Sequence, residues 1–353
     1  MSESMNQLIS TFKDDFQCEH AIPVGSGTTG IALILNAINA RDKKVIIPAM
    51  TCPNVAIAVY AAGAIPLVVD VSCSDANISM DAIQKAMGHD VAAIIAVNSF
   101  GYPARIPEIQ KIAEKYQCCV IEDACQAYGG ITNKTSLGNR RAVGIISFGY
   151  AKPIDSGTGG GMIITNDPLI AERIGQEIKN KEYQIASWLK NKITLHLMLK
   201  GKNSLLRQLA GYGIYKFGFP KKSVSRVDRQ WARLKQDRQK LIDTIKCISD
   251  ILNSMTGIEL FEYESNGWLS WRYSFKVPDA QDKMNLIQKF RALNIPFSHL
   301  YQPLPQQIQG IQSHGGLKNT DLISRQIVNL KYSMDLNTVK SLLDKLQCLK
   351  RTI

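Results

Sequence analysis

The feature that most restricts the fold of this chain is an alternation, over residues 18–167, of short Val- and Ile-rich runs with longer segments of helical periodicity. Runs such as Val45-Ile46-Ile47 are apolar at consecutive positions, which indicates strands buried on both faces. Such strands, separated by helices, form a sheet covered by helices on both sides. We therefore predict an α/β fold with a mostly parallel sheet sandwiched by helices. The predicted strands are 20–24, 44–48, 64–71, 91–99, 118–123, 144–148 and 161–165, and the predicted helices are 28–40, 53–62, 80–87 and 106–116.

The pattern changes after about residue 169. A basic segment follows, then a long helical stretch over 223–255, and then a smaller α+β pattern that ends in a helix over 337–349. A chain of 353 residues is long enough for two domains. We predict a large domain over 15–240, with a basic helical insert at about 179–222, and a small C-terminal domain over 245–353.

Cysteine usage and hydropathy exclude several classes of protein. The eight cysteines form no C-x-x-C pair and the five histidines do not cluster near them, so we expect neither a metal site nor a disulfide framework. No apolar run approaches the roughly 20 residues that span a bilayer. The first residues lack a basic segment followed by an apolar one. We expect a cytoplasmic protein.

Three chemical features fall at predicted strand ends. A Gly/Ser/Thr turn, 25–30, leads from a strand into a helix; Asp123 ends another strand; and Lys152 follows a third, before a glycine cluster at 157–161. In a parallel sheet these ends share one edge, where ligands bind. An amine, a buried carboxylate and a helix N-terminus for a phosphate are the parts that a pyridoxal phosphate (PLP) enzyme needs, with Thr28 and Thr29 as further phosphate donors.

Each feature has another interpretation. The turn Gly25-x-Gly27-x-x-Gly30 matches the dinucleotide fingerprint. That fingerprint also needs an acidic residue at the end of the next strand to hold a ribose, and residues 45–50, where this strand ends, contain none. Asp123 could be a helix N-cap. Lys152 could be an ordinary solvated lysine. Gly30 in the first turn of a helix suggests a close backbone approach.

The residues also resemble a known family. IEDACQAYG, SGTTGIAL, and SFGYAK followed by MIITND resemble signatures of the DegT-type (DegT/DnrJ/StrS) sugar aminotransferases, members of the fold type I PLP superfamily. The resemblance is dense over residues 18–167 and loose in the C-terminal third. It implies that Lys152 binds the cofactor covalently and that Asp123 pairs with its ring nitrogen. It also implies that Gln126 contacts the ring hydroxyl and that Thr28 and Ser147 hold the phosphate, in the turn that includes Gly27 and Thr29.

Three departures from the family pattern affect the substrate side. Cys52 stands where the family usually has an aromatic residue that stacks on the cofactor ring, and Tyr128 stands where it often has His. The motif that supplies an Asn from the neighbouring subunit is absent from 215–230. Some relatives replace the lysine with His and become dehydratases, so Lys152 favours transamination.

The resemblance implies a homodimer that moves an amino group from an amino acid, L-glutamate by expectation, to a keto-sugar nucleotide, in surface polysaccharide or secondary-metabolite sugar biosynthesis. Two alternatives remain: a non-nucleotide, cyclic keto acceptor, or a PLP-binding regulatory or scaffold protein without turnover. We expect no nucleic-acid partner.

The segment 179–222 carries a charge of +9 of the net +12 of the chain and interleaves lysines with aromatic and Leu residues. A helical insert with solvated lysines is the first interpretation. The lysines could instead surround a substrate diphosphate, or make weak contact with an anionic membrane surface, which would place the protein at the inner membrane face.

Overall fold

The computed structural model describes residues 2–132, 135–140, 142–150, 152–179, 219–262, 269, 271–331 and 335–351. Most of the basic insert predicted at 179–222 lies outside these ranges. None of the helices in the described ranges is long and apolar enough to cross a membrane.

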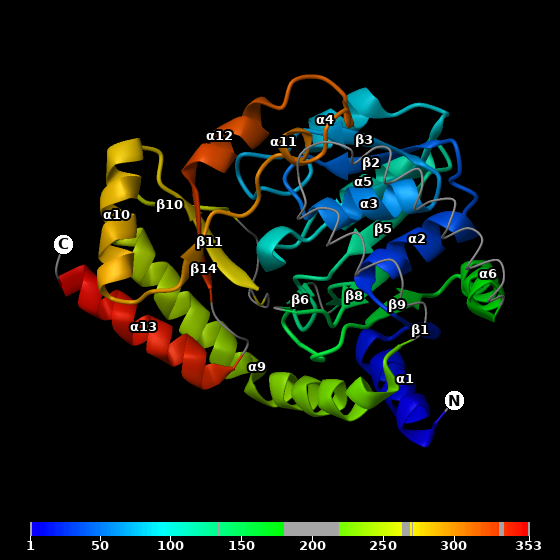
Figure 1. The fold of residues 1–353 in the computed structure, drawn as a ribbon, viewed down its shortest axis with the longest axis horizontal. Coiled ribbons are helices and arrows are strands. Elements are labelled where there is room, and N and C mark those ends of the chain that lie inside the picture. Colours follow the sequence, from blue (N-terminus) through cyan, green and yellow to red (C-terminus); the bar gives the residue numbers. More distant parts are fainter. Residues whose placement is uncertain are drawn as a thin grey trace.

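The core of the structure is an eight-stranded sheet in the order β1-β9-β8-β5-β4-β2-β3-β13 (Figure 1). Only β9 pairs antiparallel with its neighbours, β1 and β8; all other neighbouring strands pair parallel. The prediction of a mostly parallel sheet is therefore confirmed. The strands are β1 His20–Val24, β2 Lys44–Pro48, β3 Ile65–Val69, β4 Val91–Val97, β5 Cys119–Asp123, β8 Val143–Ser147, β9 Gly161–Thr165 and β13 Gln312–Ser313.

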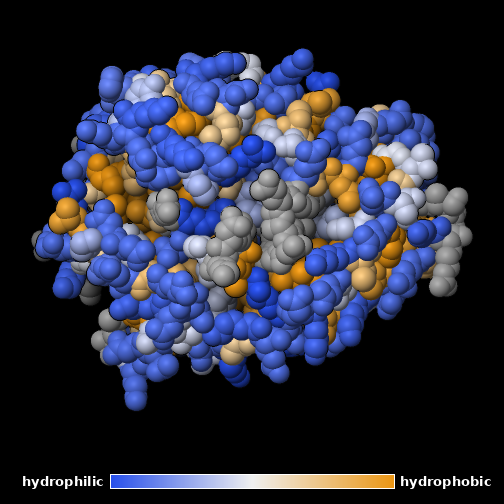
Figure 2. All heavy atoms as spheres, turned by 180° about the vertical axis from the view of Figure 1, so that it is seen from behind, coloured by the Kyte–Doolittle hydropathy of each residue, from blue (hydrophilic) through white to orange (hydrophobic). Residues whose placement is uncertain are grey.

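Helices cover both faces of this sheet. On one face, α2 (Gly27–Ala37), α3 (Pro53–Ala61) and α6 (Pro168–Lys179) pack their apolar side chains against the strands. On the other face, α4 (Met80–Ala86) and α5 (Ile106–Glu114) do the same. Most large apolar side chains of these elements are therefore buried. On the face shown in Figure 2, hydrophilic side chains predominate and apolar ones form separate patches.

A second, four-stranded antiparallel sheet forms the C-terminal part, in the order β10-β11-β14-β12. Helices α10 (Ala280–Ala292) and α13 (Leu336–Arg351) lie with it at the left of Figure 1. Its strands are β10 Glu259–Leu260, β11 Arg272–Lys276, β12 Phe297–Ser298 and β14 Ile327–Lys331. The other C-terminal helices are α12 Lys318–Gln326 and α11 Leu304–Gln307, and α11 buries Leu304 in the core of the large sheet. The chain crosses back once, because β13 joins the large sheet beside β3.

The long helical stretch predicted over 223–255 forms one helix that connects these parts, and an N-terminal helix that was not predicted packs against it. α1 (Glu3–Phe16) buries Phe12 and Phe16, whose rings stack with Trp231 of α9 (Val224–Asn253). Further along, α9 packs against α13. The predicted boundary at 240–245 therefore falls within one continuous helix, and the large domain predicted from residue 15 has α1 packed onto it.

Candidate active site

The phosphate turn folds as the sequence predicts. β1 ends at Val24, and α2 begins at Gly27 with Ser26 as its N-cap, whose hydroxyl accepts a hydrogen bond from the Thr29 N–H at 3.0 Å. The Thr29 and Ser26 hydroxyls are 2.9 Å apart, so this cap is fixed from two sides. The N-terminus of a helix has further N–H groups without intrahelical partners and a positive dipole end, which suit a phosphate.

Gly27 lets this turn approach two other strand ends. A Cβ atom on Gly27 would lie 2.9 Å from the Cys125 sulfur and 3.0 Å from Cβ of Ser147. A Cβ on Gly30 would lie 2.2 Å from Cδ1 of Ile145, which confirms the predicted close approach. The structure therefore brings the turn, the residues after β5 and the end of β8 to one edge of the sheet.

Asp123 ends β5 in the centre of the sheet and is 5% exposed. Its Oδ1 accepts a hydrogen bond from the Cys125 N–H at 2.9 Å, and the thiol of Cys125 also interacts with this carboxylate. The alternative interpretation as a helix N-cap is wrong, because residues 124–129 form turns and no helix. A buried carboxylate at the end of a central strand suits a cationic ring nitrogen.

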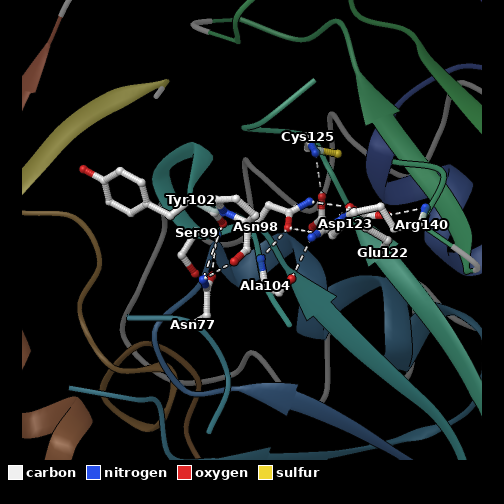
Figure 3. A network of polar contacts seen from close by, with 10 residues as sticks. Asn77, Asn98, Ser99, Tyr102, Ala104, Glu122, Asp123, Cys125 and Arg140 are labelled. Carbon is white, nitrogen blue, oxygen red and sulfur yellow. Dashed lines mark hydrogen bonds and ion pairs between the residues drawn. The ribbon is translucent and has the colours of Figure 1, made fainter. Parts of the chain in front are cut away.

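A buried ion pair between Glu122 and Arg140 lies beside Asp123 (Figure 3). Its neighbour Glu122 is fully buried and accepts hydrogen bonds from Nε of Arg140 at 2.8 Å and from the Asn98 amide at 2.9 Å. Arg140 also donates to the Ala104 carbonyl and to Oδ1 of Asn98, at 2.8 and 2.7 Å. This network ties β4 to β5 and so fixes the strand end that carries Asp123.

Lys152 follows β8, and its amine lies over an aromatic ring from another segment of the chain. Its Nζ is 5.2 Å from the ring centre of Trp271, the residue before β11. Burial raises the pKa of the Cys52 thiol, the positive charge of Lys152 lowers it, and the carboxylate of Asp123 raises it. Cys52, Lys152 and Asp123 therefore share one electrostatic environment, as a site built from them requires. Lys152 is not an isolated solvated lysine.

Gln126 is buried and points at a tyrosine that the sequence analysis did not single out. Its Oε1 accepts from the Phe100 N–H at 2.9 Å, and its Nε2 donates to the hydroxyl of Tyr301 at 3.2 Å. Burial raises the pKa of Tyr301 well above its usual range, and Arg272 opposes this. The Tyr301 hydroxyl is therefore a neutral group beside Gln126, whose expected contact with a ring hydroxyl stays a prediction.

Tyr128 has a structural function here. Its hydroxyl accepts a hydrogen bond from the Ile154 N–H at 2.8 Å and lies 2.9 Å from the Ser147 carbonyl, to which it donates. Tyr128 therefore clamps the end of β8 to the loop that carries Lys152. A histidine at this position could not reproduce both contacts in the same way, because its ring nitrogens are placed differently.

The residues present fit PLP. Besides the helix N-terminus and Asp123, the hydroxyl of Thr51 is buried without a hydrogen-bond partner in the described ranges, and it belongs to the residue that precedes Cys52. A buried polar atom of this kind indicates an absent partner. Among the described residues, His, Cys, Asp and Glu side chains form no group of three that could hold a metal ion.

A lysine, a buried strand-end carboxylate and a phosphate turn at the carboxyl edge of an α/β sheet define the class of fold type I PLP-dependent enzymes. The sequence matches the DegT/DnrJ/EryC1/StrS aminotransferase family over residues 2–347. The chain belongs to this family, which confirms the resemblance and replaces the dinucleotide interpretation of the turn.

Relatives and solved structures agree with this assignment. A UDP-N-acetyl-3-dehydro-alpha-D-glucosamine 3-aminotransferase of Acidithiobacillus ferrooxidans is 31% identical over 54% of this chain and 49% of its own length. An L-glutamine:2-deoxy-scyllo-inosose aminotransferase of Streptomyces kanamyceticus is 31% identical over 46% of this chain and 38% of its own. The match thus spans less than half the length of these relatives.

Two crystal structures share the fold along nearly the whole chain. A DegT/DnrJ/EryC1/StrS aminotransferase from Brucella abortus has a TM-score of 0.77 at 21% identity, covering 99% of this chain and 91% of that one. DesV of S. venezuelae has a TM-score of 0.77 at 19% identity, covering 100% and 91%. Both confirm the α/β fold predicted from the alternating pattern.

Proposed function

We propose that this chain is a PLP-dependent aminotransferase that moves an amino group from an amino acid, with L-glutamate as the donor, to the keto group of a keto-sugar nucleotide. The observation that supports the proposal most directly is that the Gly27 turn, the residues after Asp123 and the end of β8 lie at one edge of the sheet, with Lys152 five residues after Ser147. Membership of an aminotransferase family supports the reaction class.

The site residues have different roles in the proposed reaction. PLP, when bound, supplies an electron sink that stabilises negative charge at the donor carbon. Lys152 would hold the cofactor through its amine, and after the donor displaces it the same amine would move the proton at that carbon. Asp123 would keep the ring nitrogen protonated, and Ser147 with Thr28 and Thr29 would hold the phosphate.

Two relatives favour different acceptors. The name of the A. ferrooxidans protein specifies a UDP-linked 3-keto sugar, which supports a nucleotide-linked acceptor. The S. kanamyceticus protein acts, by its name, on 2-deoxy-scyllo-inosose with L-glutamine, which supports the alternative of a cyclic acceptor without a nucleotide. Protection of the protein against thermal unfolding by UDP, dTDP or GDP distinguishes the two, because only a nucleotide-linked acceptor requires such a site.

Absorbance spectroscopy tests the cofactor and the reaction together. Purified protein incubated with PLP should show a visible band of covalently held cofactor, and glutamate should bleach it. Lys152→Ala should lack the band, while the exposed control Lys111→Ala keeps it. A wild-type protein without the band contradicts the cofactor assignment. A band that no amino donor changes favours the non-catalytic alternative.

The proposal extends to assembly and location. We infer a cytoplasmic homodimer with its sites near the subunit interface, which the family resemblance supports. Light scattering of the purified protein measures the mass, and a monomer at micromolar concentration with full activity would refute the dimer.

A further inference from the structure

Among the residues that the structure describes, Trp271 is an aromatic residue that contacts the amine of Lys152. The Lys152 Nζ lies over its indole ring, 5.2 Å from the centre, within the range of a cation–π interaction. The two residues come from different sheets: Lys152 follows β8 of the large sheet, and Trp271 precedes β11 of the small one. The contact therefore depends on how the two parts of the chain pack together.

Several contacts fix Trp271 in place. It is only 7% exposed, and its backbone N–H donates to the Phe100 carbonyl at 2.9 Å. The guanidinium of Arg272 also lies over the indole, with Cζ 4.1 Å from the ring centre, and such stacking holds the ring plane. Trp271 is thus a fixed platform and not a mobile lid.

The anchor of this platform belongs to the site itself. Phe100 has a left-handed backbone, with φ 58°, which is unusual for a residue other than glycine. Its N–H donates to Gln126, and its ring stacks on Tyr301 at 5.8 Å. The position of the Trp271 ring is therefore coupled to the residues that follow Asp123, so the platform and the cofactor site are built as one unit.

We propose that Trp271 is a positioning residue that holds the amine of Lys152 over its ring whenever this amine is not bound to the cofactor. The inference rests on the proposed function. Lys152 must leave the cofactor when the amino donor arrives and must then stay close enough to move a proton at the donor carbon. A long, flexible lysine needs a place to rest, and the ring attracts its charged form. Cys52 beside it offers a thiol and no aromatic face.

The first test uses the protein without cofactor and needs no activity. Reductive methylation with ¹³C-formaldehyde labels the lysines, and the resonance that disappears in Lys152→Arg belongs to Lys152. We expect this resonance to be displaced upfield by the indole ring current in the wild type and to lose the displacement in Trp271→Leu. Trp271→Phe, which keeps a smaller aromatic face, should retain part of it. A Lys152 resonance at the ordinary lysine position in the wild type overturns the proposal, even if Trp271→Leu does not fold.

The second test separates positioning from a structural role. With PLP bound, glutamate should bleach the cofactor band of Trp271→Leu about tenfold more slowly than that of the wild type. This is the size of effect expected from the loss of one cation–π contact. Glutamate deuterated at the α carbon should show a larger isotope effect in this variant, and Trp271→Phe should restore both values in part. The proposal is overturned if Trp271→Leu slows the bleaching equally with deuterated and ordinary glutamate and if Trp271→Phe restores neither rate. If wild-type protein does not react with glutamate at all, the proposed function fails, and the resonance still decides the position of Lys152.

Discussion

The buried pair of Glu122 and Arg140 permits a quantitative prediction for the variant Arg140→Met. Arg140 is 7% exposed and Glu122 is fully buried. Methionine is similar in length but makes none of the three side-chain contacts of Arg140, so Glu122 keeps the Asn98 amide and the N–H of residue 140 as its donors. Loss of one partner of a buried pair typically costs about 3–5 kcal/mol, because a carboxylate stays buried without a counter-charge.

The measurement is the free energy of unfolding from urea denaturation. Lys44→Met is the matched control, because Lys44 forms an ion pair of similar length, 2.7 Å, with Asp90, but both side chains are exposed. Its loss should cost no more than about 1 kcal/mol. The double variant Glu122→Leu/Arg140→Met, which removes both charges, should recover much of the stability. If Arg140→Met costs no more than Lys44→Met, the network does not support β5 as we argue.

Three further predictions concern the site and its surroundings. Gly27→Ala should lower the affinity for PLP, measured by cofactor titration, because its Cβ would press on the Cys125 sulfur, and Cys125→Ala should restore part of the affinity. Burial raises the pKa of Asp75 above its usual 3.8, so the folded state holds the proton more tightly and loses stability as pH rises through the folded-state pKa; Asp75→Asn should therefore unfold at a higher temperature than wild type at pH 7 and at the same temperature below pH 3.8. Burial also raises the pKa of the half-buried Cys52, so iodoacetamide should modify it more slowly than the exposed Cys247, as peptide mass spectrometry can measure; equal rates would contradict the raised pKa.

Local sequence patterns were sufficient to predict the large sheet and its chemical edge. Strands that are buried on both faces appear in the sequence as consecutive Val and Ile residues. The turns that follow such strands appear as Gly, Asp or Ser directly after the apolar run. Lys152, Asp123 and the Gly27 turn all lie within 130 residues of each other, in segments of this kind. Their convergence follows from the rule that parallel strands end at the same edge.

Trp271 and Tyr301 could not be predicted in the same way. They reach the site from the second sheet, more than 100 residues after Lys152, and short strands such as β12 leave no clear periodicity. The role of Tyr128 depends on backbone groups of Ser147 and Ile154, which carry no side-chain signal. α1 is a different case, because Leu8, Phe12 and Phe16 recur at helical spacing and could have been recognised.

The helix α9 has a consequence for how this protein can be divided. It runs through 30 residues, about 45 Å, and packs on α1 near one end and on α13 further along. A cut at the end of the large sheet region would leave each fragment with half of a helix whose apolar side chains lack their partners. The two parts are therefore not exchangeable modules. A fragment that contains either part alone would have to include the whole of α9, and the other part would then lack the apolar side chains that this helix packs into its core.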